Sequence, residues 1–187
     1  MVPDETELAP DGEESPGESD EDLLALRDRI GGGVRAARLH RGQLSVEIAP
    51  ASLEEAARFL REERGFAMLS FVAGVDCLEL PVPYRFKATY SLLDPARARR
   101  IRLEAPCEDD LEPRLPSVSG VWPGAAPHES EAYDLLGIVF DGNEQLERIL
   151  TPEGFEGYPH RKDFDISSEP VAFSFRDTPA GKPEARE

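Results

Sequence analysis

The feature that most limits the fold of this chain is a strict alternation of apolar and polar side chains from Tyr84 to Leu92. The apolar positions are Tyr84, Phe86, Ala88, Tyr90 and Leu92, and Arg85, Lys87, Thr89 and Ser91 stand between them. Successive side chains of a β-strand point to opposite faces of its sheet, so a period of two predicts a strand with one buried and one polar face. We therefore expect a half-buried central sheet.

Four more segments have the composition of strands, and they lie at 34–40, 43–49, 67–80 and 99–105. Arg41-Gly42 separates the first two and predicts a tight hairpin, since Gly tolerates the positive φ that two-residue turns require. In the last segment, alternation around Ile101 places Arg100 and Arg102 on the outward face. The basic cluster is therefore interpreted as sheet surface and not as a groove for nucleic acid.

A short helix is predicted before the hairpin. Ser19 or Asp20 can cap it, because their side-chain oxygens accept hydrogen bonds from the first amides of a helix. The helix carries Leu23, Leu24, Leu26 and Ile30. The run Gly31-Gly32-Gly33 ends it, since glycine readily takes the left-handed conformation of a helix C-terminus. This run lacks the Lys-Ser/Thr ending of a phosphate-binding loop, so we predict no nucleotide site there.

A second helix follows the hairpin. Ser52 and Glu55 have the spacing of a capping box, and apolar residues then recur at helical spacing as far as Gly65. The order helix, strand, strand, helix and three strands predicts an α+β fold. We expect a mixed or antiparallel sheet with two or three helices packed on it, followed by a loop-rich C-terminal extension.

The charge of the chain is unevenly distributed and suggests three parts. The formal net charge is -17, and residues 1–22 hold ten Asp or Glu but no Lys or Arg. A segment this acidic and poor in apolar side chains cannot offset the entropy cost of ordering, so residues 1–19 are predicted to be a disordered leader. Residues 20–110 form the predicted α+β domain, and residues 111–187 form the loop-rich segment.

The C-terminal part, from 111 to 187, is predicted to have little regular structure. A short helix is expected at 129–136, ended by Gly137, with an extended piece at 138–140. Large aromatic side chains then stand on irregular chain, and they are Phe155, Tyr158, Phe164, Phe173 and Phe175. Two interpretations stay open: these side chains order on binding a partner, or the tail folds back across its own sheet.

Composition excludes several classes of function. The acidic balance disfavours nucleic-acid binding. Cys77 and Cys107 are too few for a disulfide framework or an iron–sulfur site, and reduced, cytosolic thiols are expected. The three histidines have no zinc spacing, so no metal ligand is assigned. Since no apolar run approaches the roughly 20 residues that span a bilayer, we expect a soluble chain whose membrane association comes through partner proteins.

The pattern Glu129-x-Glu131-x-x-Asp134 concentrates carboxylates on the predicted short helix. Its spacing predicts Glu131 and Asp134 on one helical face, with Tyr133 and Glu129 on another. The natural cations for them are Arg148, Arg161 and Lys162. A guanidinium can hold a carboxylate with two hydrogen bonds, so we expect these charges to lock the C-terminal loops to one another or to a neighbouring subunit.

A catalytic interpretation of the same residues is the main alternative. Glu129, Glu131 and Asp134 with His128 would form an acid/base set in a stand-alone hydrolase, since crowded carboxylates can split their pKa values. No nucleophile motif, metal pair or glycine-rich cofactor loop accompanies them. Charge-rich short helices are usually solvated or interfacial, and we therefore favour the structural interpretation, with Trp122 and Tyr133 as packing anchors.

Several motifs in order, from Leu115 to Phe164, carry a family resemblance. They are Ser117-Val118 with Trp122, Glu129-x-Glu131-x-x-Asp134-Leu135-x-Gly137-Ile138, Phe140-x-Gly142, Arg148-Ile149-Leu150-x-Pro152 and Gly157-x-Pro159-x-Arg161-Lys162-Asp163. The order resembles the C-terminal signature of the C subunits, also called the thirty-kilodalton subunit family, of bacterial NADH:quinone oxidoreductase (respiratory complex I). The resemblance marks as interface or structural candidates Trp122, Glu129, Glu131, Asp134, Gly137, Arg148, Pro152, Gly157, Pro159, Arg161, Lys162 and Asp163.

The chain also departs from the family pattern. Ser130 replaces an arginine, Asn143-Glu144 replaces His-Pro, and Asp165 replaces a proline. These departures indicate a divergent branch. Related subunits occur in membrane-bound hydrogenases, formate hydrogenlyases and ferredoxin- or F420-linked dehydrogenases, and an equivalent scaffold role in one of those complexes is the second hypothesis.

The resemblance implies a non-redox structural subunit in the peripheral arm of a proton-translocating NADH:quinone oxidoreductase. Electrons in such a complex pass from NADH through FMN and iron–sulfur clusters to quinone. It implies no catalytic, cofactor-binding or metal residue in this chain, because those centres belong to partner subunits. The implied partners are other peripheral-arm subunits, chiefly the D subunit, which shapes the quinone site. The implied location is the cytoplasmic side of the cell membrane, reached through the complex.

Overall fold

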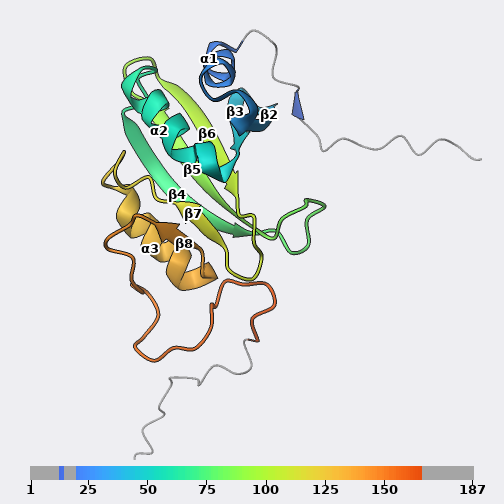
Figure 1. The fold of residues 1–187 in the computed structure, drawn as a ribbon, viewed down its shortest axis with the longest axis vertical. Helices are drawn as coiled ribbons and strands as arrows, with labels where there is room; N and C mark the ends of the chain where they lie inside the picture. The colour runs from blue at the N-terminus through green and yellow to red at the C-terminus, as the bar shows by residue number, and fades with distance from the viewer. Residues whose placement is uncertain (1–12, 15–19, 166–187) are drawn as a thin grey trace, which may run out of the picture.

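A six-stranded mixed sheet organises the protein. The computed structural model describes residues 13–14 and 20–165 of the 187. The sheet has the strand order β1-β2-β3-β6-β5-β4, in which only the β3–β6 pair is parallel. Its strands are β1 (Glu13–Glu14), β2 (Val34–His40), β3 (Gln43–Ile48), β4 (Met68–Asp76), β5 (Phe86–Asp94) and β6 (Arg99–Pro106). With three α-helices this is the predicted α+β fold, which is confirmed (Figure 1).

The helices are α1 (Glu21–Ile30), α2 (Leu53–Glu62) and α3 (Ala125–Leu136). Asp20 caps α1, because its Oδ1 accepts hydrogen bonds from the amides of Asp22 and Leu23 at 3.0 and 3.2 Å. Gly31 ends α1, as predicted, but with a φ of 49° and a ψ of -115° it does not take the left-handed helical conformation. A short 3-10 turn (Gly31–Gly33) then leads into β2.

The predicted capping box of α2 is wrong. A 3-10 turn (Pro50–Ser52) precedes the helix and holds Ser52 in a helical conformation, so its hydroxyl makes no capping hydrogen bond. The Ser52 hydroxyl instead packs on Gly33, where a Cβ would lie 2.4 Å from its Oγ. Glu55 accepts a hydrogen bond from Arg29 Nε of α1 at 3.1 Å. The local spacing was right for a helix start, but packing between elements determines what the two side chains contact.

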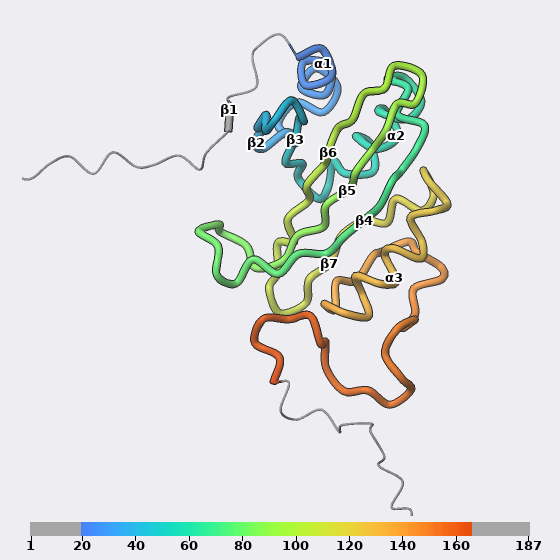
Figure 2. The backbone as a smooth tube through the Cα atoms, turned by 180° about the vertical axis from the view of Figure 1, so that it is seen from behind, coloured from blue at the N-terminus to red at the C-terminus, as the bar shows by residue number. Residues whose placement is uncertain are grey.

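The two faces of the sheet differ in what covers them. The apolar side chains of β3, β6 and β5 are buried in one core with those of α1 and α2. Gly74 of β4 meets Ala132 and Leu136 of α3, which places that helix on the same face. The opposite face carries the polar positions, and no helix of the described residues crosses it (Figure 2). The prediction of a sheet with one buried and one polar face is thus confirmed.

Strand β4 ends earlier than predicted and β5 begins later. The apolar run to Leu80 predicts a long strand, yet β4 stops at Asp76, whose Oδ1 accepts a hydrogen bond from the Leu78 amide at 3.0 Å. Tyr84 and Arg85 likewise precede β5. Pro81 and Pro83 explain the difference, because proline has no amide to donate to a strand ladder. Residues 77–85 form a loop instead.

A second, two-stranded sheet joins the start of the C-terminal part to its middle. β7 (Arg114–Pro116) runs parallel to β8 (Val139–Asp141) on either side of α3. The predicted extended piece at 138–140 corresponds to β8, whereas β7 was not predicted. Pro113 just before it and Pro116 at its end indicate loop in the sequence, and only the parallel pairing with β8 makes it a strand. The hydrophobic core includes residues of this part, such as Leu115, Trp122 and Phe140.

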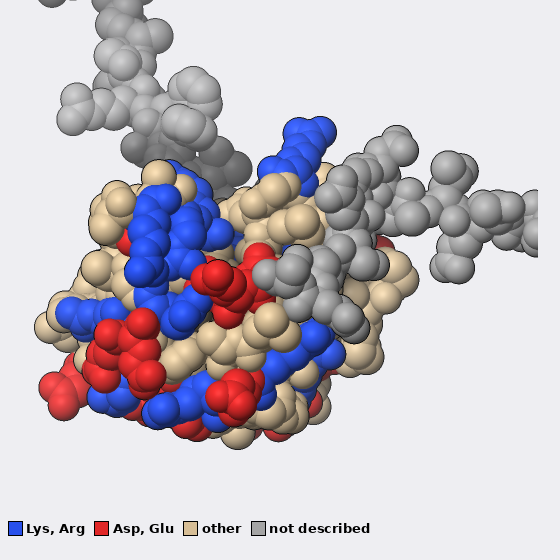
Figure 3. All heavy atoms as spheres, turned by 90° about the horizontal axis from the view of Figure 1, so that it is seen from above, with Lys and Arg blue, Asp and Glu red and all other residues tan. Residues whose placement is uncertain are grey.

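Ion pairs fasten α1 to the end of the main sheet. Asp22 of α1 accepts hydrogen bonds from Arg64 and Arg99, and Arg99 also donates to Asp94 at 2.9 Å. Figure 3 looks down on this end of the molecule and shows basic and acidic side chains interleaved over it. Arg97 and Arg99 therefore contact carboxylates at this end, while Arg100 is exposed on the polar face.

Two predicted segments fall largely outside the described residues. Glu13–Glu14 pairs with β2 as a short antiparallel strand. The remainder of the acidic leader, and the tail from 166 with Phe173 and Phe175, are not described. The disorder of residues 1–19 stays a prediction, and so do the two interpretations of the tail beyond Asp165.

The contact between β4 and α3 gives a test of this architecture. A Cβ on Gly74 would lie 2.6 Å from Leu136 Cδ1 and 3.2 Å from Ala132 Cβ. We expect Gly74→Ala to lower the free energy of unfolding by about 1–3 kcal/mol in urea titration, because the helix must shift outward. Gly120→Ala is the control, since nothing lies within 4 Å of its Cβ position. Equal stability of both variants would contradict the described packing.

Candidate functional site

The candidate site is built around helix α3, whose two buried carboxylates hold the chain on either side of it. Glu129 and Asp134 are both fully buried. Glu129 holds the segment before the helix, and Asp134 holds the segment after it. Carboxylates are seldom buried without several hydrogen-bond donors, so each has assembled donors around itself.

Asp134 organises residues 149–151. Its Oδ2 accepts hydrogen bonds from three consecutive amides, those of Ile149, Leu150 and Thr151, at 2.9, 2.7 and 2.9 Å. Its Oδ1 accepts from the Thr151 hydroxyl and from Arg148 Nη1 at 3.3 Å. Burial alone would raise the pKa of Asp134, but the hydrogen bonds from Thr151 and the two amides before it outweigh burial and hold the pKa at about 2. The carboxylate is therefore ionised at neutral pH.

Glu129 organises residues 117–118 and Asn143. Its Oε1 accepts the Val118 amide at 2.8 Å, and its Oε2 accepts the Ser117 hydroxyl at 2.7 Å and Asn143 Nδ2 at 3.0 Å. These donors are neutral, and burial is the larger influence, so the pKa of Glu129 is raised above its usual value. Asn143, where the family pattern has histidine, thus completes the set of donors to this carboxylate.

The chain returns from residue 151 to the end of α3. Gly137 ends the helix with a φ of 78°, and a Cβ there would lie 2.6 Å from the Tyr158 ring and 2.7 Å from Arg161 Nη2. Arg161 Nε donates to the Leu136 carbonyl at 2.8 Å, and its guanidinium lies over the rings of Tyr158 and Phe86. Gly137 is therefore required both for its backbone conformation and for the close approach of these side chains.

Asp76 is the functional position that the sequence analysis missed. This buried carboxylate at the end of β4 accepts the Lys162 amide at 3.0 Å and Arg85 Nη2 at 3.4 Å. Arg85 also pairs with Asp163. Burial opposes ionisation of Asp76, but the amide donors and Arg85 lower its pKa overall. An Asp that ends an apolar strand 86 residues before its partner gives no local signal of this contact.

The remaining candidates occupy varied positions. Trp122 is buried in the core, whereas Pro152 is exposed and Pro159 is half-buried. The Gly157 carbonyl accepts a hydrogen bond from Arg148 Nη2 at 3.0 Å, and Lys162 Nζ lies 3.4 Å from Glu79. Glu131 is exposed, whereas Asp134, predicted on the same face of the helix, is buried. A difference of about 60° around the helix separates a buried from a solvated side chain.

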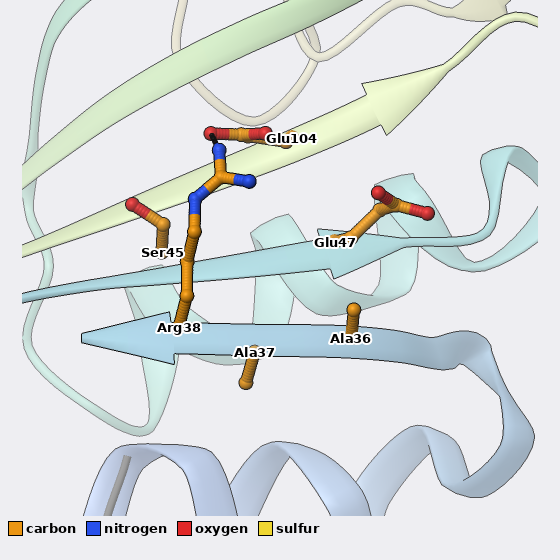
Figure 4. Close-up of a pocket in the computed structure, with 6 residues that line it drawn as sticks. All are labelled: Ala36, Ala37, Arg38, Ser45, Glu47 and Glu104. Atoms are coloured by element: carbon orange, nitrogen blue, oxygen red, sulfur yellow. Dashed lines mark hydrogen bonds and ion pairs between the residues drawn. The ribbon is translucent and has the colours of Figure 1, made fainter. Parts of the chain in front are cut away.

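A hollow on the polar face of the sheet is the other place where charged groups gather. It has a volume of about 180 Å³ between β2 and β6. Figure 4 shows Arg38 reaching across β3 to Glu104 of β6, while Ala37 points to the opposite side of β2. Lys87 Nζ lies 2.7 Å from the same buried carboxylate. Burial opposes ionisation of Glu104, but the two cations lower its pKa, which makes this a structural ion-pair network.

The geometry does not assemble the acid/base set of the hydrolase alternative. The oxygens of Glu129 and Asp134 accept structural hydrogen bonds, and Glu131 points to solvent.

Cys77 and Cys107 flank β5 from opposite sides, because their amides donate to the carbonyls of Arg85 and Phe86. Within residues 20–165 no group of three or more His, Cys, Asp or Glu has a metal-binding arrangement. Nor does any helix in that range have the length and apolar character to cross a membrane.

Comparisons with known proteins agree in one family. Residues 46–170 match the family model described as "Respiratory-chain NADH dehydrogenase, 30 Kd subunit". The chain is 40% identical over 169 residues to the C subunit of NADH-quinone oxidoreductase from Roseiflexus sp. strain RS-1, and the match covers 88% of this chain and 95% of the relative. It is 42% identical over 151 residues to the C subunit from Roseiflexus castenholzii, with coverages of 79% and 85%.

Two solved structures are similar in fold. The trypsin-resistant fragment (1-134) of Nqo5 superimposes with a TM-score of 0.58 and 29% identity, covering 65% of this chain and 96% of the fragment. A chain of the archaeal membrane-bound sulfane sulfur reductase gives a TM-score of 0.65 at 23% identity, covering 77% of this chain and 84% of that one. At that identity the second likeness concerns the fold alone.

The low pKa of Asp134 predicts a dependence of stability on pH. Its folded pKa of about 2 lies below the usual 3.8, so its stabilisation is present above pH 4 and is lost as the pH falls towards 2. We expect Asp134→Asn to lower the free energy of unfolding at pH 7 by about 2–4 kcal/mol, since the amides lose a charged acceptor.

The same variant should approach the wild type as the pH falls below 4, which denaturant titrations at pH 7, 5 and 3 can follow. Glu131→Gln is the matched control on the same helix, and we expect it to stay within about 0.5 kcal/mol of the wild type. A gap between Asp134→Asn and the wild type that is constant from pH 7 to 3 would show that the charge of Asp134 is not what holds residues 149–151.

Proposed function

Because this chain belongs to the thirty-kilodalton subunit family of the respiratory-chain NADH dehydrogenase, we propose that it is a structural subunit of the peripheral arm of a proton-translocating NADH:quinone oxidoreductase. Membership of the family makes it a scaffold subunit of an NADH:quinone oxidoreductase-type complex. Its contribution to the enzyme is therefore made within the complex.

The observation that carries the scaffold role is the way residues 142–165 are held. This stretch has little regular secondary structure, yet Asp134 and Asp76 fix it at residues 149–151 and at 162. Ile149 and Leu150 donate their amides inward while their side chains remain 47% and 60% exposed. A pre-ordered segment with exposed aliphatic side chains can bind a partner at low entropic cost.

The partner that we propose for this segment is the D subunit of the complex, the one that forms the quinone site. We further propose that the chain binds no FMN, iron–sulfur cluster or quinone itself, and that these centres lie in partner subunits. In support, Glu129, Asp134 and Asp76 have their oxygens occupied by hydrogen bonds from this chain. We place the chain at the membrane through the complex, on its cytoplasmic side.

Arg161 gives the proposal a direct test. Arg161→Glu would bring a carboxylate to the Leu136 carbonyl and to the Tyr158 and Phe86 rings, and both contacts favour a cation. We expect the affinity-tagged variant to recover about tenfold less of the other subunits than the wild type, measured by quantitative mass spectrometry after purification from solubilised membranes.

Two variants complete this experiment. Arg161→Lys keeps the charge and should recover an intermediate amount, because an ammonium cannot reproduce the planar stacking. Arg58→Glu reverses an exposed charge on α2 and should recover the wild-type amount. Recovery of all subunits by Arg161→Glu would contradict the docking role. The identity of the co-purified proteins also decides between NADH:quinone oxidoreductase and a related hydrogenase or dehydrogenase complex.

A further inference from the structure

A second group of exposed aliphatic side chains stands at the opposite end of the sheet from α1. Loop 77–85, between β4 and β5, projects clear of the sheet in both views (Figures 1 and 2). It exposes Leu78, Leu80 and Val82 by 49%, 49% and 37%, and Leu111 in the neighbouring loop 107–113 is 88% exposed. We call these two loops together the loop tip. Such a concentration of large apolar side chains is typical of a contact surface.

The loop tip is rigidly built. The Cys77 amide donates to the Arg85 carbonyl at 2.6 Å, and the Leu80 amide donates to the Cys77 carbonyl at 2.8 Å. Pro81 and Pro83 fix their own φ angles between the exposed side chains. The Arg85 amide donates to Asp110 at 2.8 Å and thereby joins the two loops. Little conformational entropy is left to lose when the tip binds, so its apolar side chains are presented ready for contact.

Charge around the tip limits what it can bind. Apart from Arg85 at the base, the two loops contain no Lys or Arg, and their acidic residues are Glu79, Glu108, Asp109, Asp110 and Glu112. Lys162 and Arg35 pair with Glu79 and Glu108, and the remaining carboxylates keep the tip acidic, so anionic lipid headgroups would be repelled; a second copy of the chain carries the same net charge of -17. The complementary surface is an apolar depression bordered by Lys or Arg side chains on a different protein.

The tip is also bonded to residues 142–165, which we call the C-terminal docking segment. Asp76 accepts hydrogen bonds from the amides of both Leu78 and Lys162, and Arg85 pairs with Asp163. Lys162 Nζ lies 3.4 Å from Glu79 in the loop itself. One buried carboxylate thus fixes the loop tip and the segment after residue 158 relative to each other.

We propose that the loop tip is a second docking element, which inserts Leu78, Leu80 and Val82 into an apolar pocket bordered by basic side chains on a neighbouring subunit of the complex. The inference rests on the proposed scaffold function and adds to it a surface and the chemistry of its partner. Asp76 sets the distance and angle between the two docking elements, so a partner that binds both is held in one orientation.

The first test replaces the three side chains together, as Leu78→Ser, Leu80→Ser and Val82→Ser, in the tagged full-length chain purified from solubilised membranes. Because all three are exposed, the isolated variant should keep its circular dichroism spectrum and melting temperature. The neighbouring subunits should be recovered about tenfold less. Leu24→Ser is the matched control, a leucine 47% exposed on α1, and should recover the wild-type amount.

The second test identifies the partner surface. A photo-crosslinking amino acid at position 80 should join the tip to a peptide of another subunit that contains apolar residues next to Lys or Arg. Crosslinks to lipid or to a second copy of the chain, or none at all, would overturn the proposal. So would full recovery of the subunits by the triple variant. If Asp134→Asn loses the subunits while the triple variant keeps them, the scaffold function stands and the loop tip is not part of it.

Discussion

The contact between Asp134 and three consecutive amides is the interaction on which the C-terminal part of this protein depends. A stretch of 24 residues, 142–165, lies outside helices and strands and has only isolated backbone hydrogen bonds, such as that from the His160 amide to the Leu135 carbonyl, so residues 149–151 depend on a side chain for their order. Asp134 supplies it, because a buried, ionised carboxylate is stable only while the amides of 149–151 and the Thr151 hydroxyl surround it. The carboxylate and the segment therefore stabilise each other.

The same principle recurs at Glu129 and Asp76. Glu129 lies inside α3 and Asp76 ends β4, both are buried, and each accepts a backbone amide from a distant segment outside the helices and strands. The pKa outcome differs between the sites: burial outweighs the hydrogen bonds at Glu129 and raises its pKa, whereas the hydrogen bonds outweigh burial at Asp134 and Asp76 and lower theirs. The two buried carboxylates of α3 thus hold loops in place. Their oxygens already accept hydrogen bonds from this chain, although the same acidic motif suggests an acid/base site in the sequence.

Local patterns predicted much of the fold but little of the site. Alternation and capping identified the hairpin, α1 and the polar face, because these depend on neighbours in sequence. The strand β7 and the contacts of Ser52 depend on distant residues, and no local pattern reports those. The family motif identified Glu129 and Asp134, but it grouped the exposed Glu131 with them. Asp76 accepts a hydrogen bond from the Lys162 amide, and no pattern in the sequence predicted that contact.

Amide hydrogen exchange in the isolated chain tests the central claim most directly, namely that the docking segment is ordered before any partner binds. If Asp134 holds it, the amides of Ile149, Leu150 and Thr151 exchange slowly at pH 7, and Asp134→Asn abolishes that protection while the amides of β5 stay protected. Exchange of these three amides at the rate of an unstructured peptide in the wild-type chain would contradict the account, because the segment would then acquire its order only from a partner.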